Sequence, residues 1–165
     1  SERSVGHAAA AAGTVGTSVG LTFVIRDNTE REDDSDLDGD PFTLADLNPG
    51  VNFVEIRAFR DGAELVAAEL EREEFDTDQP TTLRAPADGL PSIAGNGDVN
   101  LSLLGVDVVG VPGITEFEDD GDNPVTPSAF AALVDRGVIV EVRWDAFAGD
   151  TTQPAEQMSI EEDDD

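Results

Sequence analysis

The run "TEREDD" at Thr29–Asp34 returns later in the chain as "TEFEDD" at Thr115–Asp120. In the first position it follows "VGLTFVIRDN", an apolar and β-branched segment that predicts a strand. The same pattern in two places of a 165-residue chain indicates an internal repeat, and a repeat constrains the architecture more strongly than any single element does. We therefore expect two copies of one folding unit.

Further matches extend the repeat in the same order along the chain. Gly50 corresponds to Gly137, and the terminal run "AAELEREE" that begins at Ala67 corresponds to "AEQMSIEE" beginning at Ala155. Between them, "EIR" at residues 55–57 corresponds to "EVR" at 141–143, and the period is about 86 to 88 residues. We predict three parts, namely a small-residue N-terminal segment at 1–20, a first β-repeat at 21–75, and a second β-repeat with an acidic tail at 76–165.

Strand and turn signals within the copies predict an all-β chain with a short helix or turn in each unit. Asp61-Gly62 is a hairpin signal between two strands. Ser128 is the expected cap of the one segment with helical spacing. The other expectations are a strand over 19–30, a hairpin over 51–73, one continuous apolar strand over 99–110, a helix within 126–137 and a hairpin with a longer loop over 138–162.

The repeat unit resembles the five-six-six-six family, a family of secreted bacterial modules of unknown function. The resemblance rests on an apolar strand, a Thr-acidic loop, a short "L-x-D-L-x-x-G" helix or turn, and a "V-E-I/V-R" strand. These lie at Leu21–Asp34, Leu44–Gly50, Val54–Arg57 and Ala67–Glu74, and again at Val106–Asp120, Leu133–Gly137, Val140–Arg143 and Ala155–Glu162. The resemblance implies tandem OB-like β-barrels in an exported protein, without catalytic residues.

One departure from this pattern concerns the first copy. It lacks an opening strand equivalent to "TTLRAPADG" at residues 81–89, and a Gly- and Ala-rich segment stands in that place. Either that segment substitutes for the strand, or the first barrel is open on one side. Residues 4–19 contain no proline, so every amide in them can donate to a sheet. Two alternatives remain open, since the segment can fold back onto its own barrel or pair with an adjacent subunit.

Composition excludes several classes of partner. The chain has 37 acidic and nine basic residues, a net charge of −28, and all nine basic residues are Arg. Nothing here could displace phosphate counterions, so nucleic acid and anionic membrane surfaces are excluded as partners. The absence of Cys excludes disulfides and thiolate chemistry, and no apolar run reaches membrane-spanning length. Because the chain starts at Ser1 without Met, we expect a processed product or a fragment. The expected location is extracellular or at the cell surface, with any signal peptide already removed.

The acidic loop "DDSDLDGD" at residues 33–40 is the candidate metal site. Its Asp-x-Asp-x-Asp-Gly spacing matches the first half of a calcium loop, but the twelfth position is Ala45, where an EF-hand requires Glu. Flanking strand and turn patterns also disfavour an EF-hand. The loop is therefore either a solvated connection or a weak cation site, and calcium is the one cofactor considered. The four ligands would be Asp34, Asp36, Asp38 and Asp40.

The remaining chemistry-bearing residues indicate a protein that is not an enzyme. His7 is the single histidine and cannot form a typical zinc site alone. Trp144 should face the core together with Val142, because they are two residues apart on a predicted strand. No nucleophile elbow or phosphate loop occurs in the sequence.

Two functions follow from these observations. The first is a structural subunit of an extracellular filament, surface layer or matrix, whose partners are copies of itself joined by β-strand pairing. The second is a calcium-dependent or carbohydrate-binding β-barrel module. Divalent cations are expected partners in either case, because the carboxylates are so numerous.

Overall fold

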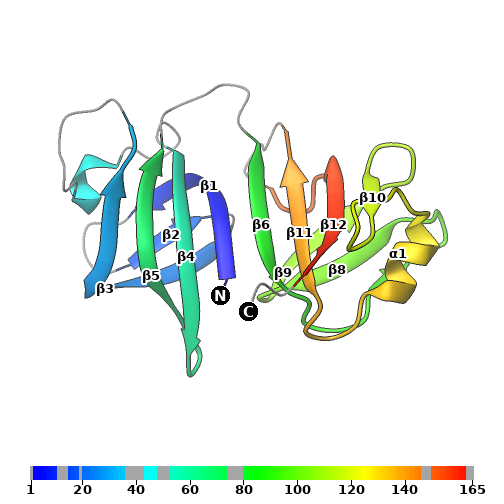
Figure 1. The fold of residues 1–165 in the computed structure, drawn as a ribbon, viewed down its shortest axis with the longest axis horizontal. Coiled ribbons are helices and arrows are strands. Elements are labelled where there is room, and N and C mark those ends of the chain that lie inside the picture. Colours follow the sequence, from blue (N-terminus) through cyan, green and yellow to red (C-terminus); the bar gives the residue numbers. More distant parts are fainter. Residues whose placement is uncertain are drawn as a thin grey trace. The chain divides into compact units, whose positions relative to one another are not determined.

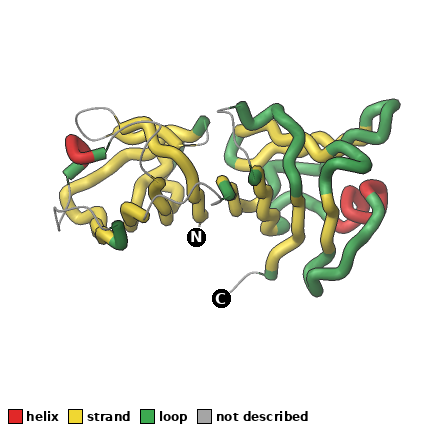
Figure 2. The backbone as a smooth tube through the Cα atoms, turned by 90° about the horizontal axis from the view of Figure 1, so that it is seen from above, coloured by secondary structure: helices red, strands yellow, loops and turns green. Residues whose placement is uncertain are grey.

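The computed structural model describes residues 2–10, 15–18, 20–35, 43–47, 53–73, 80–145 and 150–162. The chain divides into two compact units, Ser1–Thr81 and Thr82–Asp165. Strands dominate both of them, as the yellow segments of Figure 2 show, so the expected all-β class is confirmed. The helical elements in the described residues are one short α-helix and one 3-10 turn.

Unit 1 is built mainly from strands, several of them long (Figure 1). The predicted hairpin at Asp61-Gly62 is confirmed, and Gly62 takes a positive φ of 64° that glycine adopts without strain. The elements of unit 1 are β1 (Glu2–Ala10), β2 (Val15–Ser18), β3 (Leu21–Asp33), η1 (Leu44–Asp46), β4 (Phe53–Asp61) and β5 (Glu64–Glu73).

The strand pairings of unit 1 give every strand two neighbours. β1 pairs with β2, β2 with β3, and β4 with β5, all antiparallel, whereas β3 pairs with β5 in parallel. β4 also pairs with β1 along Phe53–Ala58, antiparallel to Glu2–His7. The order of pairing is therefore β1–β2–β3–β5–β4, with an additional pairing between β4 and β1.

The N-terminal segment thus lies on its own unit in this single chain. In this chain the segment has the fold-back arrangement, with β1 between β2 and β4. Pairing of residues 4–19 with a different chain stays a prediction. The opening strand that the first copy lacks in sequence is supplied by this segment. The sequence left this open, because Ala and Gly carry no alternation of apolar and polar residues that marks a strand.

The core of unit 1 comes from the inward-facing positions of β3, β4 and β5. Leu21, Phe23 and Ile25 alternate with more exposed residues, as expected for a strand with one face in the core. Val54 and Ile56 on β4 and Leu70 on β5 are buried against them.

Unit 2 begins within β6 and consists of shorter strands and the helix. Its elements are β6 (Thr81–Pro86), β7 (Ser92–Ile93), β8 (Val99–Leu103), β9 (Val106–Gly110), β10 (Glu116–Glu118), α1 (Pro127–Leu133), β11 (Ile139–Trp144) and β12 (Gln157–Glu161). β7, β8 and β9 form a three-stranded antiparallel sheet, whereas β10, β12, β11 and β6 are successive neighbours in another. The predicted hairpin with a longer loop is the antiparallel pair β11–β12.

Two predictions in unit 2 were wrong. The apolar run 99–110 is two strands rather than one, because Leu104 and Gly105 take positive φ values of 54° and 81° and form a tight turn. Leucine rarely adopts that conformation, so the run carried no turn signal. The helix cap is Thr126 rather than Ser128: the Thr126 Oγ1 accepts the Ala129 N–H at 3.2 Å, and Pro127 at the helix start lacks an N–H.

Matched threonines occupy matched positions in the two units. The Thr29 hydroxyl donates to the Ala67 carbonyl at 2.7 Å and accepts the Arg26 N–H at 2.9 Å. In unit 2 the Thr115 hydroxyl donates to the Ala155 carbonyl at 2.6 Å and accepts the Val111 N–H at 2.8 Å. Both threonines are 7% exposed.

The strand registers of the two units match as well. Glu30, Arg31 and Glu32 of β3 lie parallel to Glu69, Leu70 and Glu71 of β5. At the matching positions in sequence, residues 116–118 of β10 lie parallel to 157–159 of β12. Residues 55–57 of β4 and 141–143 of β11 face those same two strands in one register.

Candidate functional sites

The predicted carboxylate loop is only partly within the described residues. Asp34 is exposed, and its backbone N–H donates to the Arg72 carbonyl at 2.8 Å. Asp36, Asp38 and Asp40 lie outside the described residues. The weak cation site therefore stays a prediction.

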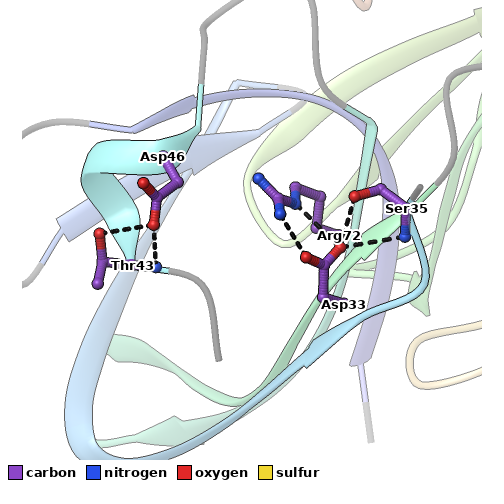
Figure 3. A network of polar contacts seen from close by, with 5 residues as sticks. All are labelled: Asp33, Ser35, Thr43, Asp46 and Arg72. Atoms are coloured by element: carbon purple, nitrogen blue, oxygen red, sulfur yellow. Dashed lines mark hydrogen bonds and ion pairs between the residues drawn. The ribbon is translucent and has the colours of Figure 1, made fainter. Parts of the chain in front are cut away.

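Asp33, at the start of this loop, forms a buried ion pair with Arg72 (Figure 3). Arg72 donates from Nε to the Asp33 Oδ1 at 3.0 Å and from Nη2 to Oδ2, and each side chain is only 3% exposed. The Ser35 N–H and hydroxyl also donate to Oδ1. The Arg72 hydrogen bond, aided by those from Ser35, holds the pKa of Asp33 well below its usual range although burial acts in the opposite direction. Both carboxylate oxygens are thus engaged in a structural contact.

A second carboxylate closes the turn beyond the acidic loop. The Asp46 Oδ2 accepts the Thr43 N–H at 2.6 Å and the Thr43 hydroxyl at 2.9 Å, and these bonds lower the pKa of Asp46 (Figure 3). Asp33 before the loop and Asp46 after it therefore serve local structure.

Unit 1 carries a concentrated acidic face that was not predicted. We define it as Glu32 of β3, Glu55 of β4, and Glu69, Glu71 and Glu73 of β5. Carboxylate oxygens of Glu32, Glu69 and Glu71, and likewise of Glu55, Glu71 and Glu73, lie within 4.8 Å of one another. These residues share a face because they alternate along β5 and stand opposite one another across the strands. The signal in the sequence was the alternation E-x-E-x-E at 69–73.

Repulsion across the acidic face is only partly balanced. Arg57 contacts Glu55 at 3.2 Å and Glu69 at 3.0 Å. Burial, followed by the charges of Glu73, Glu55, Asp34 and Glu32, raises the pKa of Glu71. Like charges directly opposite each other on neighbouring strands are destabilising. Repulsion among these carboxylates therefore destabilises unit 1, and salt should weaken that repulsion.

The corresponding face of unit 2 lacks this concentration of charge. Gln157 and Ser159 occupy the positions that match Glu69 and Glu71. Gln157 donates from Nε2 to the Glu118 carboxylate, and the Ser159 hydroxyl donates to the Glu161 Oε1 at 2.9 Å. Neutral donors replace two carboxylates, so neighbouring glutamates gain hydrogen bonds instead of repulsion.

Unit 2 contains a groove over the outward face of β8 and β9. Its volume is about 850 Å³, within the range of small-ligand sites. Val99, Leu101 and Leu103 of β8 point into the core, so Asn100 and Ser102 point out into the groove. Asp107 and Val109 of β9 line it from the neighbouring strand, opposite Ser102 and Asn100 respectively.

Among the described residues that line the groove, three are carboxylates and none is basic. Each carboxylate has one hydrogen bond to a neutral donor. The Asp88 Oδ2 accepts the Gly105 N–H at 2.7 Å, the Asp98 Oδ2 accepts the Asn96 Nδ2 at 2.7 Å, and the Asp107 Oδ1 accepts the Ser102 hydroxyl. Sequence reasoning missed this site, whose signal is the alternation of polar residues at 98, 100 and 102.

Trp144 is a core residue, as predicted. It is fully buried with Val142, and its Nε1 donates to the Gln153 carbonyl at 3.2 Å. His7 pairs in register with Phe53 between β1 and β4. Trp144 therefore belongs to the core of unit 2.

Comparisons with known proteins identify no relative. No family model matches the chain, and neither a curated protein nor a solved structure matches it. The resemblance to the five-six-six-six family accordingly stays a prediction from sequence patterns. Among the described residues, no helix has the length and apolar character needed to cross a membrane.

Proposed function

We propose that the chain is a non-enzymatic, exported structural protein, a subunit of a filament, surface layer or matrix that assembles by β-strand pairing. Its two units are tandem OB-like β-barrels in this proposal. The pairing order of unit 1, which returns to β1 and includes the parallel pair β3–β5, supports a barrel. In unit 2, a parallel bridge between Val109 and Pro154 joins β9 to the segment before β12, and this pairing supports a barrel there as well.

The matched contacts of the two units support their origin as repeats. A buried threonine bonded to an alanine carbonyl, and the same parallel and antiparallel registers, recur at positions aligned by sequence. Repeated modules that each bury a core of their own can serve as the repeating units of an assembly. Export is inferred from the family resemblance.

The position of β1 is the observation that carries the assembly proposal. It is the first strand of the chain, and it pairs through Ala8–Ala10 with β2 and through Glu2–His7 with β4. A neighbouring copy can supply the same backbone hydrogen bonds with its own β1, because identical chains offer identical partners. Exchange in one direction makes a heterologous contact that propagates into a filament unless it closes into a ring.

A cysteine pair tests which chain supplies β1. Arg3 and Arg57 are directly opposite in the β1–β4 register, so Arg3→Cys with Arg57→Cys places two thiols at a separation that a disulfide can bridge. The natural chain has no Cys, and the pair is therefore the only thiol source. We expect a ladder of covalent oligomers on non-reducing gels after oxidation of concentrated protein.

The single variants Arg3→Cys and Arg57→Cys are the controls, since each can form dimers at most. A double variant that oxidises quantitatively to a monomer shows that β1 stays on its own chain and overturns the assembly mechanism. Deletion of residues 1–10 provides a second check, because a truncated chain that still forms filaments also overturns it.

A ligand-binding module is a second candidate function, favoured by the groove of unit 2. The sequence raised carbohydrate and calcium as ligands. Small-ligand sites commonly use aromatic side chains, and none occurs among the described residues that line this groove. Isothermal titration of the chain with calcium and binding to a glycan array would test those two ligands directly.

A further inference from the structure

The carboxylates of the groove lie at two separate ends. At the end nearest the β8–β9 turn, Asp107 stands opposite Ser102, and the Asp88 N–H donates to the Ser102 carbonyl at 2.9 Å. Asp88 and Asp107 therefore lie at the same end of the groove, on the two sides of Ser102. Asp98 precedes β8, four residues before Ser102, which places it about 13 Å along the strand direction.

The space between the two ends is neutral and partly apolar. Asn100 and Val109 are paired across β8 and β9, and Ser92 pairs with Asn100 from β7. Val111 and Pro154 add apolar surface to the lining. The groove thus presents charge, then neutral surface, then charge.

We propose that this groove binds a linear aliphatic polyamine. One end of the ligand places an ammonium group at Asp107, at the end of the groove that Asp88 also lines, the other end places one at Asp98, and the methylene chain lies over Val109 and its apolar neighbours. Ammonium groups donate to carboxylate oxygens in charge-assisted hydrogen bonds. The inference rests on the second candidate function, and it does not depend on filament assembly.

Charge and spacing favour this ligand over the others considered. An anionic ligand would meet three carboxylates and no base in the lining. One metal ion could not contact both ends at once, because coordination distances are about 2.0–2.6 Å and the ends are about 13 Å apart. A long polyamine reaches both ends, whereas a short diamine reaches one.

Isothermal titration with spermine tests the proposal on the full chain. The net charge of −28 attracts polycations everywhere, so the measurement is made near 0.15 M NaCl, where the screening length is about 8 Å. The groove variant is Asp98→Asn with Asp107→Asn. The matched control, Asp120→Asn with Asp135→Asn, changes the net charge equally at exposed positions outside the groove. Circular dichroism verifies that both variants are folded.

We expect one spermine per chain and an affinity about tenfold weaker in the groove variant, equivalent to about 1.4 kcal/mol, with little change in the control. We also expect 1,4-diaminobutane to bind more weakly than spermine and to be less sensitive to Asp98→Asn. No saturable binding, or an equal loss in both variants, overturns the proposal. Binding of a neutral oligosaccharide that the groove variant abolishes, while spermine binding persists, also overturns it. Cross-linking of Arg3→Cys/Arg57→Cys tests assembly separately, so the two failures are distinguishable.

Discussion

At the scale of single residues, the buried pair Asp33–Arg72 anchors the end of β3 to β5. Asp33→Asn removes one charge and takes the Asp33 carboxylate away from the Arg72 guanidinium, which is 3% exposed. Removing one member of a buried ion pair typically costs about 3–5 kcal/mol. We expect a loss of this order in urea unfolding at pH 7, and much of it should be recovered in the double variant Asp33→Asn/Arg72→Met.

The same pair has a defined pH dependence. The pKa of Asp33 is lowered in the folded state, so its stabilisation is fully present above the unfolded pKa of about 3.9 and is lost as the pH falls toward the folded pKa. The difference in unfolding free energy between the natural chain and Asp33→Asn should therefore be constant from about pH 5 to pH 8 and shrink below about pH 4. A difference that instead grows on acidification contradicts this assignment.

Thr29 and Thr115 test whether the two units share one design. Thr→Val at either position removes the hydroxyl and leaves an alanine carbonyl without that donor, which should cost about 1–3 kcal/mol. We expect similar losses at both positions and near-natural stability for Thr→Ser. Far-UV circular dichroism follows the whole chain, and Trp144, the only tryptophan, reports unit 2 by fluorescence. A large effect at one threonine alone would argue against equivalent roles.

At the scale of elements, Glu71 on β5 can be compared with Ser159 on β12. Glu71→Ser gives unit 1 the residue type that unit 2 has at the matching position. It also removes a carboxylate that stands opposite Glu55. We expect a stabilisation of about 0.2–1 kcal/mol at neutral pH and low salt, the usual range for a cross-strand pair. Asp27→Ser, at an exposed position of β3 outside the acidic face, is the control.

The pH dependence of Glu71 has the opposite sign to that of Asp33. Its pKa is raised in the folded state, so the folded chain binds more protons than the unfolded chain between the two pKa values, and stability falls as the pH rises through that window. The advantage of Glu71→Ser should therefore be largest above the folded pKa and vanish below about pH 4, where the natural carboxyl is protonated in both states. An advantage independent of pH would mean that the gain comes from packing instead of charge.

Elements with explicit local signals were predictable, and elements without them were not. Asp61-Gly62 predicted the β4–β5 hairpin, because the turn requires a positive φ and glycine adopts it readily. Leu104 carries no turn signal, so the β8–β9 turn was not predicted. The groove was missed for the same reason, because it lies over the outward face that β8 and β9 form side by side. The acidic face was hidden for a related reason, since cross-strand register brings Glu55 and Glu71 together although they are distant in sequence.

At the scale of the whole molecule, the net charge of −28 makes stability depend on ionic strength. Raising the salt from about 0.1 M to about 1 M shortens the screening length from about 10 Å to about 3 Å, which weakens repulsion across the acidic face and between more distant carboxylates. We expect the thermal midpoint to rise steadily with NaCl, and to rise at lower concentrations of CaCl2 or MgCl2. Asp36→Ala should leave that response nearly unchanged, because screening is shared among many carboxylates. A sub-micromolar calcium affinity that Asp36→Ala abolishes would contradict diffuse screening and favour a dedicated site in the loop at residues 33–40.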